Sequence, residues 1–254
     1  MKSKYNVDWI KEKFESGEAL EFIFFWGHTI KSNDEIGKIC LSQWFNSPFQ
    51  VEKITYKTAE HWMMAQKALL FGDKKSFQKI ISCDNPVEVK EIGRQILYFD
   101  EKIWNENKYE IVKNGNIHKF NQSPKLADFL LQTETQIIVE ASPFDKIWGI
   151  GLSQDDLEVD NIYAWPGENL LGFALMEVRD FLKQFGHFET LIDPIKSPWS
   201  EFPNIDIQDM FWRMGKGEDC LMKFINYYTN LPEREKIIYR LTNPAPLSWE
   251  EIFE

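Results

Sequence analysis

The sequence has few residues of the kinds that signal disulfide, metal or membrane chemistry. Three cysteines, Cys40, Cys83 and Cys220, are spread over 254 residues. An odd number of distant cysteines excludes a disulfide framework and a cysteine-based zinc site, and it is typical of a reducing compartment. No apolar run approaches 18 residues, and the first residues lack the apolar core of a signal peptide. We therefore expect a soluble, cytoplasmic protein.

Common cofactor and hydrolase motifs are also missing. Neither G-x-G-x-x-G nor G-x-x-x-x-G-K-[ST] occurs, so Rossmann and P-loop nucleotide binding have no support. The four histidines are scattered, without H-E-x-x-H and without a carboxylate at metal-ligand spacing, and no G-x-S-x-G elbow is present. We expect neither a metal nor a cofactor.

Basic residues are outnumbered, with 29 Lys and Arg against 40 Asp and Glu, which gives a formal net charge of −11. Such a chain lacks the broad positive field that holds duplex nucleic acid by its phosphates. A small or single-stranded substrate therefore fits better than extended duplex. Hydrophobic residues make up 43% of the chain and aromatic residues 15%, which is ample for a packed core.

The order of the expected elements favours an α+β fold, mostly helical with a small sheet. Composition changes near residue 186, so we predict a main domain over 1–185 and a short helical appendage over 186–254. In the appendage we expect two or three short helices within 206–254. Expected strands are 22–26, 38–41 as the second arm of a hairpin turning at Asn33–Asp34, 50–56 and 136–140. Expected helices are 7–15, 59–70, 74–81, 87–96, one opened by Asp100, 125–131 and 169–185, several of them with legible N-caps at Thr58, Asp73, Asn85, Asp100 and Ser123.

Tyr56–Asp73 is the most informative segment. On a helix starting near Ala59, Glu60 and Lys67 share one face and lie two turns apart, about 10 Å along the axis. Partial burial would lower the pKa of Lys67 and make its amine nucleophilic. Glu60 lies in the first helical turn, where the dipole favours its charged form. A purely structural role, with Glu60 serving the dipole and Lys67 extending from an apolar face to water, is the alternative.

A second segment, Val139–Gly151, places polar residues after a strand end. Glu140 ends the strand, a turn of small residues presents Asp145, and Trp148 and Gly149 follow. Two carboxylates beside an indole can supply an acid or base and a wall for a flat ring. An Asx turn next to a core tryptophan is the alternative interpretation.

Aromatic residues gather in two further segments, Phe24–Thr29 and Leu41–Phe49. Trp44 and Phe45 are consecutive, so both cannot face one core, and one of them is free to stack on a base. The alternative is that these loop aromatics seal the helical layer. Arg94 is a candidate partner for a phosphate, although surface solvation is the ordinary role of such a residue.

These segments, in this order, resemble the NADAR family, also called YbiA-like. The resemblance covers roughly 21–182 and includes no part of the C-terminal stretch. Its motifs are FFWGH at 24–28, LSQWF at 41–45, YKTAEHWMMAQKALLFGD at 56–73, GR at 93–94, the stretch from Trp104 to GNIHKF ending at 120, VEASPFDKIWGIG at 139–151, and NLLGFALMEVR at 169–179.

The resemblance implies a metal-independent N-glycosidase that cleaves the bond between ribose C1 and an exocyclic base nitrogen. Substrates implied are ADP-ribosyl-guanine, as nucleoside, nucleotide or single-stranded nucleic acid, or phosphoribosyl pyrimidines, the ribosylaminopyrimidines of early riboflavin synthesis. Catalytic roles would fall on Glu60, Lys67 and Asp145. Substrate-binding residues would be Gly27, His28, Trp44, Phe45, Arg94, Trp104, Glu140, Trp148 and Gly149.

Two alternatives stay open at this point. Lys67 either forms a Schiff base with the ribose or a carboxylate activates water directly, as in glycosidases. The same aromatics and Arg94 would also suit a non-catalytic reader of ADP-ribose or a nucleotide. The C-terminal extension is a candidate for docking a protein partner.

Overall fold

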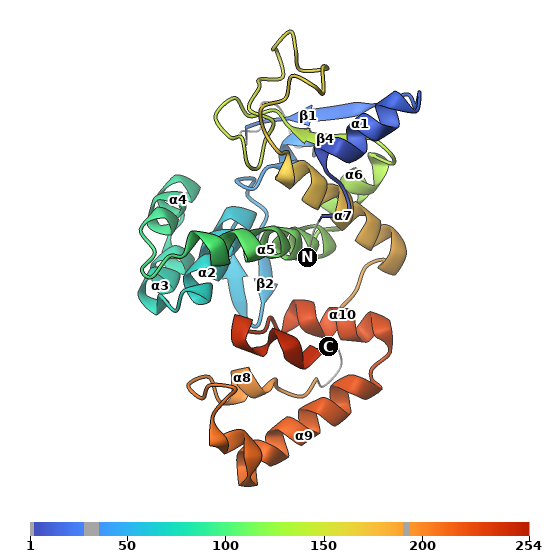
Figure 1. Ribbon diagram of the computed structural model, residues 1–254. Helices are drawn as coiled ribbons and strands as arrows, with labels where there is room; N and C mark the ends of the chain where they lie inside the picture. The colour runs from blue at the N-terminus through green and yellow to red at the C-terminus, as the bar shows by residue number, and fades with distance from the viewer. Residues whose placement is uncertain (1–2, 28–35, 190–193, 254) are drawn as a thin grey trace. The chain divides into compact units, whose positions relative to one another are not determined.

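A short parallel sheet organises the first part of the chain. In the computed structural model, strand β1 (Phe22–Phe25) pairs in parallel with β4 (Ile137–Glu140), and Phe25 lies opposite Glu140 (Figure 1). The β-branched run of β4 is buried, because both of its faces are covered. Parallel pairing brings the carboxyl ends of both strands to one edge, and the residues that follow them can share a site there.

The structure describes residues 3–27, 36–189 and 194–253. Within them the chain forms two compact units, the first of residues 1–50 and 55–187 and the second of 51–54 and 188–254. The further elements before residue 188 are α1 (Val7–Glu15), the 3₁₀ helix η1 (Lys38–Leu41), β2 (Phe49–Val51), β3 (Ile54–Tyr56), α2 (Ala59–Leu70), α3 (Lys74–Ser82), α4 (Pro86–Arg94), α5 (Glu101–Asn121), α6 (Pro124–Gln132) and α7 (Leu170–Phe185).

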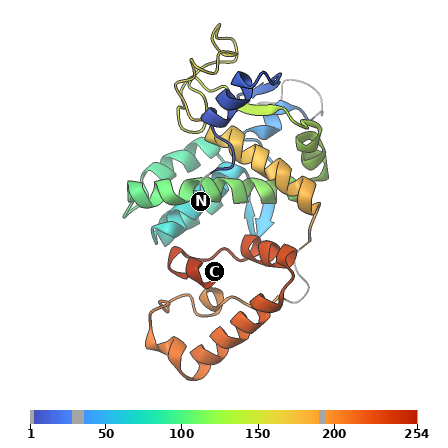
Figure 2. The ribbon, with the colours of Figure 1, turned by 45° about the vertical axis from the view of Figure 1, so that its right-hand side comes forward.

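Helix α2 packs against α3, α4 and α5, and α7 packs against α5 and β4 (Figures 1 and 2). Glycines permit the closest approaches to α2. A Cβ atom added at Gly93 of α4 would lie 2.0 Å from the Met64 Sδ atom, and one at Gly115 of α5 would lie 2.3 Å from the Trp62 ring. Helix α2 is therefore fixed from two sides.

The predicted N-caps are confirmed at four helices. Side-chain oxygens of Thr58, Asp73, Asn85 and Asp100 accept backbone N–H groups of α2, α3, α4 and α5. These bonds satisfy donors that the first helical turn leaves open. Ser123 occupies the N-cap of α6 without such a bond. The α+β class with few strands and many helices is confirmed.

Two strand predictions are wrong. Residues 38–41 form a 3₁₀ turn, because the carbonyls of Cys40 and Ser42 accept hydrogen bonds from the buried Lys119 ammonium at 2.6 and 2.8 Å. Residues 50–56 are two short strands, β2 and β3, since Glu52 and Lys53 adopt left-handed backbone conformations that turn the chain. The predicted turn at Asn33–Asp34 lies outside the described residues.

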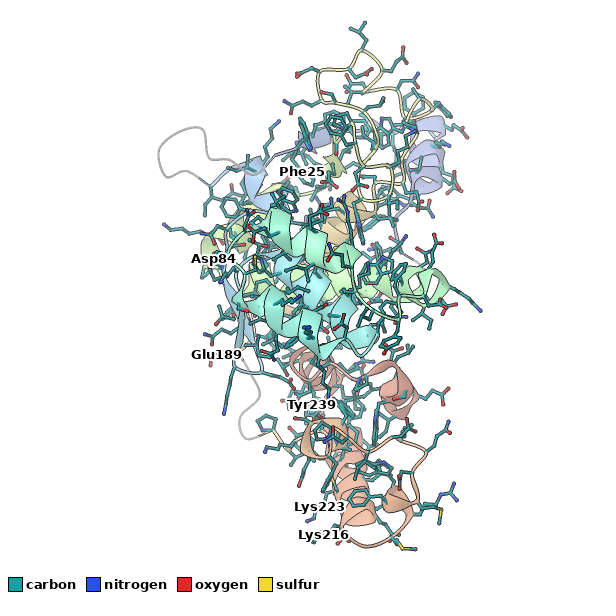
Figure 3. All side chains as sticks on the ribbon, turned by 90° about the vertical axis from the view of Figure 1, so that its left-hand side faces the viewer. Phe25, Asp84, Glu189, Lys216, Lys223 and Tyr239 are labelled. Carbon is teal, nitrogen blue, oxygen red and sulfur yellow. The ribbon has the colours of Figure 1, made fainter. Side chains whose placement is uncertain are left out.

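The second unit has a core of its own. It contains α8 (Pro198–Glu201), η2 (Met210–Arg213), α9 (Gly215–Asn230), α10 (Glu233–Thr242) and η3 (Leu247–Phe253), so the expected short helices include one of 16 residues. The buried core is aromatic: Trp199, Trp212, Phe224, Tyr228, Tyr239 and Trp249. Tyr239 is fully buried on α10, whereas Lys216 and Lys223 on α9 are exposed (Figure 3).

Whether 186–254 constitutes a separate domain stays a prediction. Among the described residues, no helix combines the length and the apolar character needed to cross a membrane.

Candidate active site

Glu60 is buried in the first turn of α2. Its side chain accepts a hydrogen bond from the Trp44 indole, and its backbone N–H donates to the Gln43 carbonyl at 3.0 Å. Thr58 caps the helix two positions before Glu60 and fixes the backbone of this turn. Burial raises the pKa of Glu60 to about 7, although Lys90 and Trp44 favour its ionised form. Glu60 can therefore exchange a proton near neutrality. The helix dipole alone, the basis for predicting a charged Glu60, is outweighed by desolvation.

Glu140 is the last residue of β4, and Asp145 lies in the turn that follows the strand. The backbone N–H of Glu140 donates to the Asn169 side chain at 3.0 Å, while its carboxyl oxygen Oε2 is buried without a hydrogen-bond partner. Burial, reinforced by Asp145, raises the pKa of Glu140 to about 8. Asp145 accepts the backbone N–H groups of Ile147 and Trp148 at 2.9 and 2.8 Å. These bonds form the Asx turn that the sequence offered as the alternative to a role in acid–base chemistry. They use one carboxyl oxygen of Asp145, and the second oxygen can still accept a hydrogen bond.

Gly149 makes this turn possible. A Cβ atom there would lie 2.7 Å from the Glu140 carbonyl and 3.1 Å from the Asp145 carbonyl. The next residue, Ile150, donates its N–H to the Glu140 carbonyl at 2.9 Å. Gly149 is thus buried inside the loop and closes it, which is a structural task, and the substrate contact predicted from the motif stays a prediction.

Lys67 is half-buried on the same face of α2. Its Nζ atom donates to the Gly93 carbonyl at 2.9 Å and lies 4.2 Å from the centroid of Phe99 and 5.3 Å from that of Trp104. Burial lowers the pKa of Lys67, and the charge of Glu60 acts in the opposite direction. The lowered pKa increases the fraction of free amine near neutrality.

Glu60 lies electrostatically between the carboxyl residues Glu140 and Asp145 and the amine of Lys67. It interacts electrostatically with Asp145 and Glu140 on one side and with Lys67 on the other. Trp44 donates to Glu60, and Trp104 faces Lys67, so two of the predicted binding aromatics border the predicted catalytic residues. Trp148 is partly buried beside Asp145 through the Asx turn.

Other predicted residues have a weaker connection to this cluster. Arg94 is exposed, forms an ion pair with Glu91, and adds only a long-range charge effect on Glu60. Phe45 is partly buried and lies under the Lys119 ammonium at 5.8 Å. Gly27 has a left-handed backbone (φ +86°) that ends β1. His28 lies outside the described residues.

Sequence reasoning missed Lys90. This residue of α4 is the largest favourable charge on Glu60, it acts on Glu140 as well, and its ammonium lies 5.7 Å from the centroid of Trp44. Lys90 precedes the recognised Gly93-Arg94 pair by three and four positions, so a helical wheel of α4 would have placed it on the same side as Arg94. The sequence of α4 mixes acidic and basic residues, so Lys90 did not stand out from its neighbours.

Two further missed residues, Asn116 and Lys119, hold the Trp44 segment. Asn116 donates to the Gln43 side chain at 3.0 Å, and Lys119 binds the carbonyls of Cys40 and Ser42. Burial lowers the pKa of Lys119 to about 8. Both residues lie in the GNIHKF motif of α5, whose chemistry the sequence alone did not disclose.

The histidines that the structure describes have structural partners. His61, the neighbour of Glu60, contacts the Thr58 hydroxyl at 2.8 Å and the Cys83 carbonyl at 3.2 Å. Burial lowers its pKa, so it remains neutral. In the described ranges, no three His, Cys, Asp or Glu side chains are grouped closely enough to hold a metal ion.

Comparison with known proteins decides the family. The family model described as NADAR domain matches residues 24–183. The chain belongs to the NADAR domain family. Its match includes every residue of the cluster around Glu60, Lys67 and Glu140. The resemblance seen in the sequence is thereby confirmed.

Several relatives carry names that describe an activity, and one does not. N-glycosidase R617 of Acanthamoeba polyphaga mimivirus is 42% identical over 168 residues, which is 64% of this chain and 97% of that protein. Protein irg-1 of Caenorhabditis elegans is 34% identical over 51% of this chain and 62% of its own length. N-glycosidase YbiA of Escherichia coli strain K12 is 30% identical over 53% of this chain and 76% of its own length.

A solved structure agrees. The NMR structure of E. coli YbiA is similar with a TM-score of 0.53 and 26% identity, covering 66% of this chain and 90% of that one. The predicted enzyme class, a hydrolase of N-glycosyl bonds, is confirmed at the level of the class by these N-glycosidase relatives.

The raised pKa of Glu140 predicts a stability that depends on pH. The folded protein keeps a proton on this carboxyl up to about pH 8, whereas the unfolded chain releases it near pH 4.5. Stability is therefore lost as the pH rises through that window. We expect Glu140→Gln to raise the free energy of unfolding by up to about 4 kcal/mol at pH 8 and by much less at pH 4.5.

Urea denaturation at both pH values measures this effect. Glu106→Gln, which neutralises an exposed carboxylate of α5, is the matched control and should leave the pH dependence unchanged. An equal change of stability at pH 4.5 and pH 8 for Glu140→Gln would contradict the burial of a proton at this position.

Proposed function

We propose that this enzyme hydrolyses the bond between ribose C1 and an exocyclic nitrogen of a base, with ADP-ribosyl-guanine or a ribosylaminopyrimidine as its substrate. The observation that carries the proposal is the pairing of a half-buried amine, Lys67, with a buried carboxyl, Glu60, on one face of one helix. Glu60 with its raised pKa is suited to donate a proton to a leaving nitrogen. Lys67 with its lowered pKa is suited to attack a sugar carbon.

The reaction proceeds through an imine. The N-riboside opens its furanose ring to an imine between C1 and the base nitrogen, and the Lys67 amine adds to C1. The bond between C1 and the base nitrogen then breaks, the nitrogen takes a proton from Glu60, and the base leaves as a free amine. Water adds to the remaining imine of C1 and Lys67, which releases the sugar and restores the lysine. The sum consumes one water per bond.

The other acidic groups act on the sugar in this proposal. Glu140, protonated near neutrality, donates a hydrogen bond to a ribose hydroxyl, and Asp145 accepts one with the oxygen that the Asx turn leaves available. The positive charge of Lys90 partly offsets the negative charge of the neighbouring carboxyl groups. The Trp44 and Trp104 rings supply flat surfaces for the base or the sugar.

A substrate panel tests the proposal. Purified enzyme is incubated with ADP-ribosyl-guanosine, with the same adduct in a single-stranded oligonucleotide, and with a phosphoribosylaminopyrimidine. Release of the free base is followed by chromatography. Turnover of at least one substrate with loss in Lys67→Arg supports the proposal, and absence of release from all three substrates overturns it.

We extend the proposal to the ligands, the cellular compartment and the C-terminal extension. Guanine adducts in single-stranded nucleic acid, or small phosphoribosyl pyrimidines, suit a chain with a net charge of −11 better than duplex does. We propose a cytoplasmic location, and the three free cysteines are compatible with a reducing compartment. For the extension we propose protein docking, supported by exposed apolar side chains in and between η2 and α9, namely Met210, Met214 and Met222.

A further inference from the structure

Two exposed aromatic residues stand at the edge where both strands of the parallel sheet end. Trp26 directly follows Phe25, the last residue of β1, which is labelled in Figure 3. Phe144 directly precedes Asp145 in the turn after β4. The Ala141 N–H donates to the Phe25 carbonyl at 2.9 Å, so the parallel ladder continues up to this point. Segments 118 positions apart in the chain (144 − 26) thus meet beside Glu140 and Asp145.

The two rings contact each other while most of their surface stays in water. Their centroids are 6.1 Å apart with an interplanar angle of 52°. Trp26 is 49% exposed and Phe144 is 86% exposed. A tilted pair of this kind is an open corner, in which one ring offers a face and the other an edge. Large aromatic rings left this open next to acidic groups of a site are typical of surfaces that bind flat ligands.

We propose that Trp26 and Phe144 form a stacking corner for a second planar ring of the substrate, distinct from the base whose bond is cleaved. The inference rests on the proposed function, because it takes the carboxyl cluster next to Asp145 as the reacting centre. Base stacking on an aromatic side chain requires only a π-face, so it accepts any nucleobase. The ring is therefore the adenine of an ADP-ribosyl group or the base adjoining the modified one in a single strand.

Substrates with and without that second ring test the corner. We compare Trp26→Ala and Phe144→Ala with the unmodified protein on three substrates: ribosyl-guanosine, ADP-ribosyl-guanosine, and a ribosyl-guanosine dinucleotide. Loss of either ring should raise KM about 5- to 30-fold for a substrate that carries the second planar ring. KM for ribosyl-guanosine, which lacks that ring, should change far less. Trp26→Phe should restore most of the affinity, since it retains a stacking face.

The chain provides a matched control. Phe14 and Tyr163 form another exposed pair, each ring 55% exposed, with centroids 6.3 Å apart. Neither residue adjoins a carboxyl of the cluster in the sequence. Phe14→Ala should change KM for none of the three substrates, and thermal denaturation shows whether each variant is folded.

Binding measurements separate failure of the corner from failure of the proposed function. Calorimetry with ADP-ribose, ribose 5-phosphate and an unmodified dinucleotide needs no turnover. Selective weakening of one base-containing ligand in Trp26→Ala and Phe144→Ala supports the corner, even for a protein that cleaves nothing, and it identifies which source supplies the ring. Unchanged binding and KM in folded variants, or an equal loss on ribosyl-guanosine, overturns the inference.

Discussion

Replacing Lys67 with arginine is expected to lower kcat by about 10³-fold or more, with little change in KM. Arginine keeps the positive charge and can still donate to the Gly93 carbonyl and stack on Phe99, so binding and folding should persist. A guanidinium does not lose its proton near neutrality and therefore cannot attack a sugar carbon. Steady-state kinetics on the substrate of highest turnover measures the effect.

Trapping gives a second and independent readout. Borohydride added during turnover should reduce the imine and add the mass of the sugar to the protein at Lys67, and Lys67→Arg should gain no mass. Lys125→Arg, at an exposed position of α6, should react and turn over like the unmodified enzyme. Normal turnover by Lys67→Arg, without any adduct in the unmodified protein, would instead favour direct attack by water that a carboxylate activates.

Glu60→Gln is expected to lower kcat by about 10²- to 10⁴-fold, because the leaving nitrogen loses its proton donor. The amide can still accept the Trp44 hydrogen bond, so the local structure should be retained. In the unmodified enzyme, activity should fall as the pH rises past about 7, where burial places the pKa of Glu60 and the acid loses its proton. The variant should lack that decline, which a pH–rate profile reveals.

Glu88→Gln is the matched control for this prediction. Glu88 is the first-turn glutamate of α4, as Glu60 is of α2, but it is exposed. Its variant should keep both the rate and the alkaline decline. A decline near pH 7 that persists in Glu60→Gln would assign the titrating group elsewhere in the cluster, with Glu140 as the first candidate.

Periodicity and capping allowed much of the helical layer to be predicted. Four helix starts could be predicted from their N-cap residues, Thr58, Asp73, Asn85 and Asp100. The hydrogen bond of an N-cap is local, because it joins residues two or three positions apart. The same locality explains the placement of Glu60 and Lys67 on one face. Such relations can be read from the sequence because the helix itself fixes them.

Predictions failed where a distant residue decides the local conformation. Residues 38–41 form a 3₁₀ turn instead of a strand, because Lys119, some 80 positions away in the sequence, donates hydrogen bonds to the carbonyls of Cys40 and Ser42. Lys90 was missed for a similar reason: its role depends on how α4 lies against α2, which the close contact of Gly93 with Met64 determines. The direction of the Glu60 pKa also required the burial that tertiary packing creates.

The Lys67 amine and the Glu60 carboxyl belong to a single rigid helix, which neighbours fix at Gly93 and Gly115. The backbone positions of these two residues are consequently fixed by the fold, and the helix does not adjust to the ligand. Changes of specificity among proteins with this scaffold should therefore concentrate in the loops after β1 and β4, while the helix preserves the reaction. Exchanging those two loops between members of the family is a direct route to altered substrate preference with the chemical step retained.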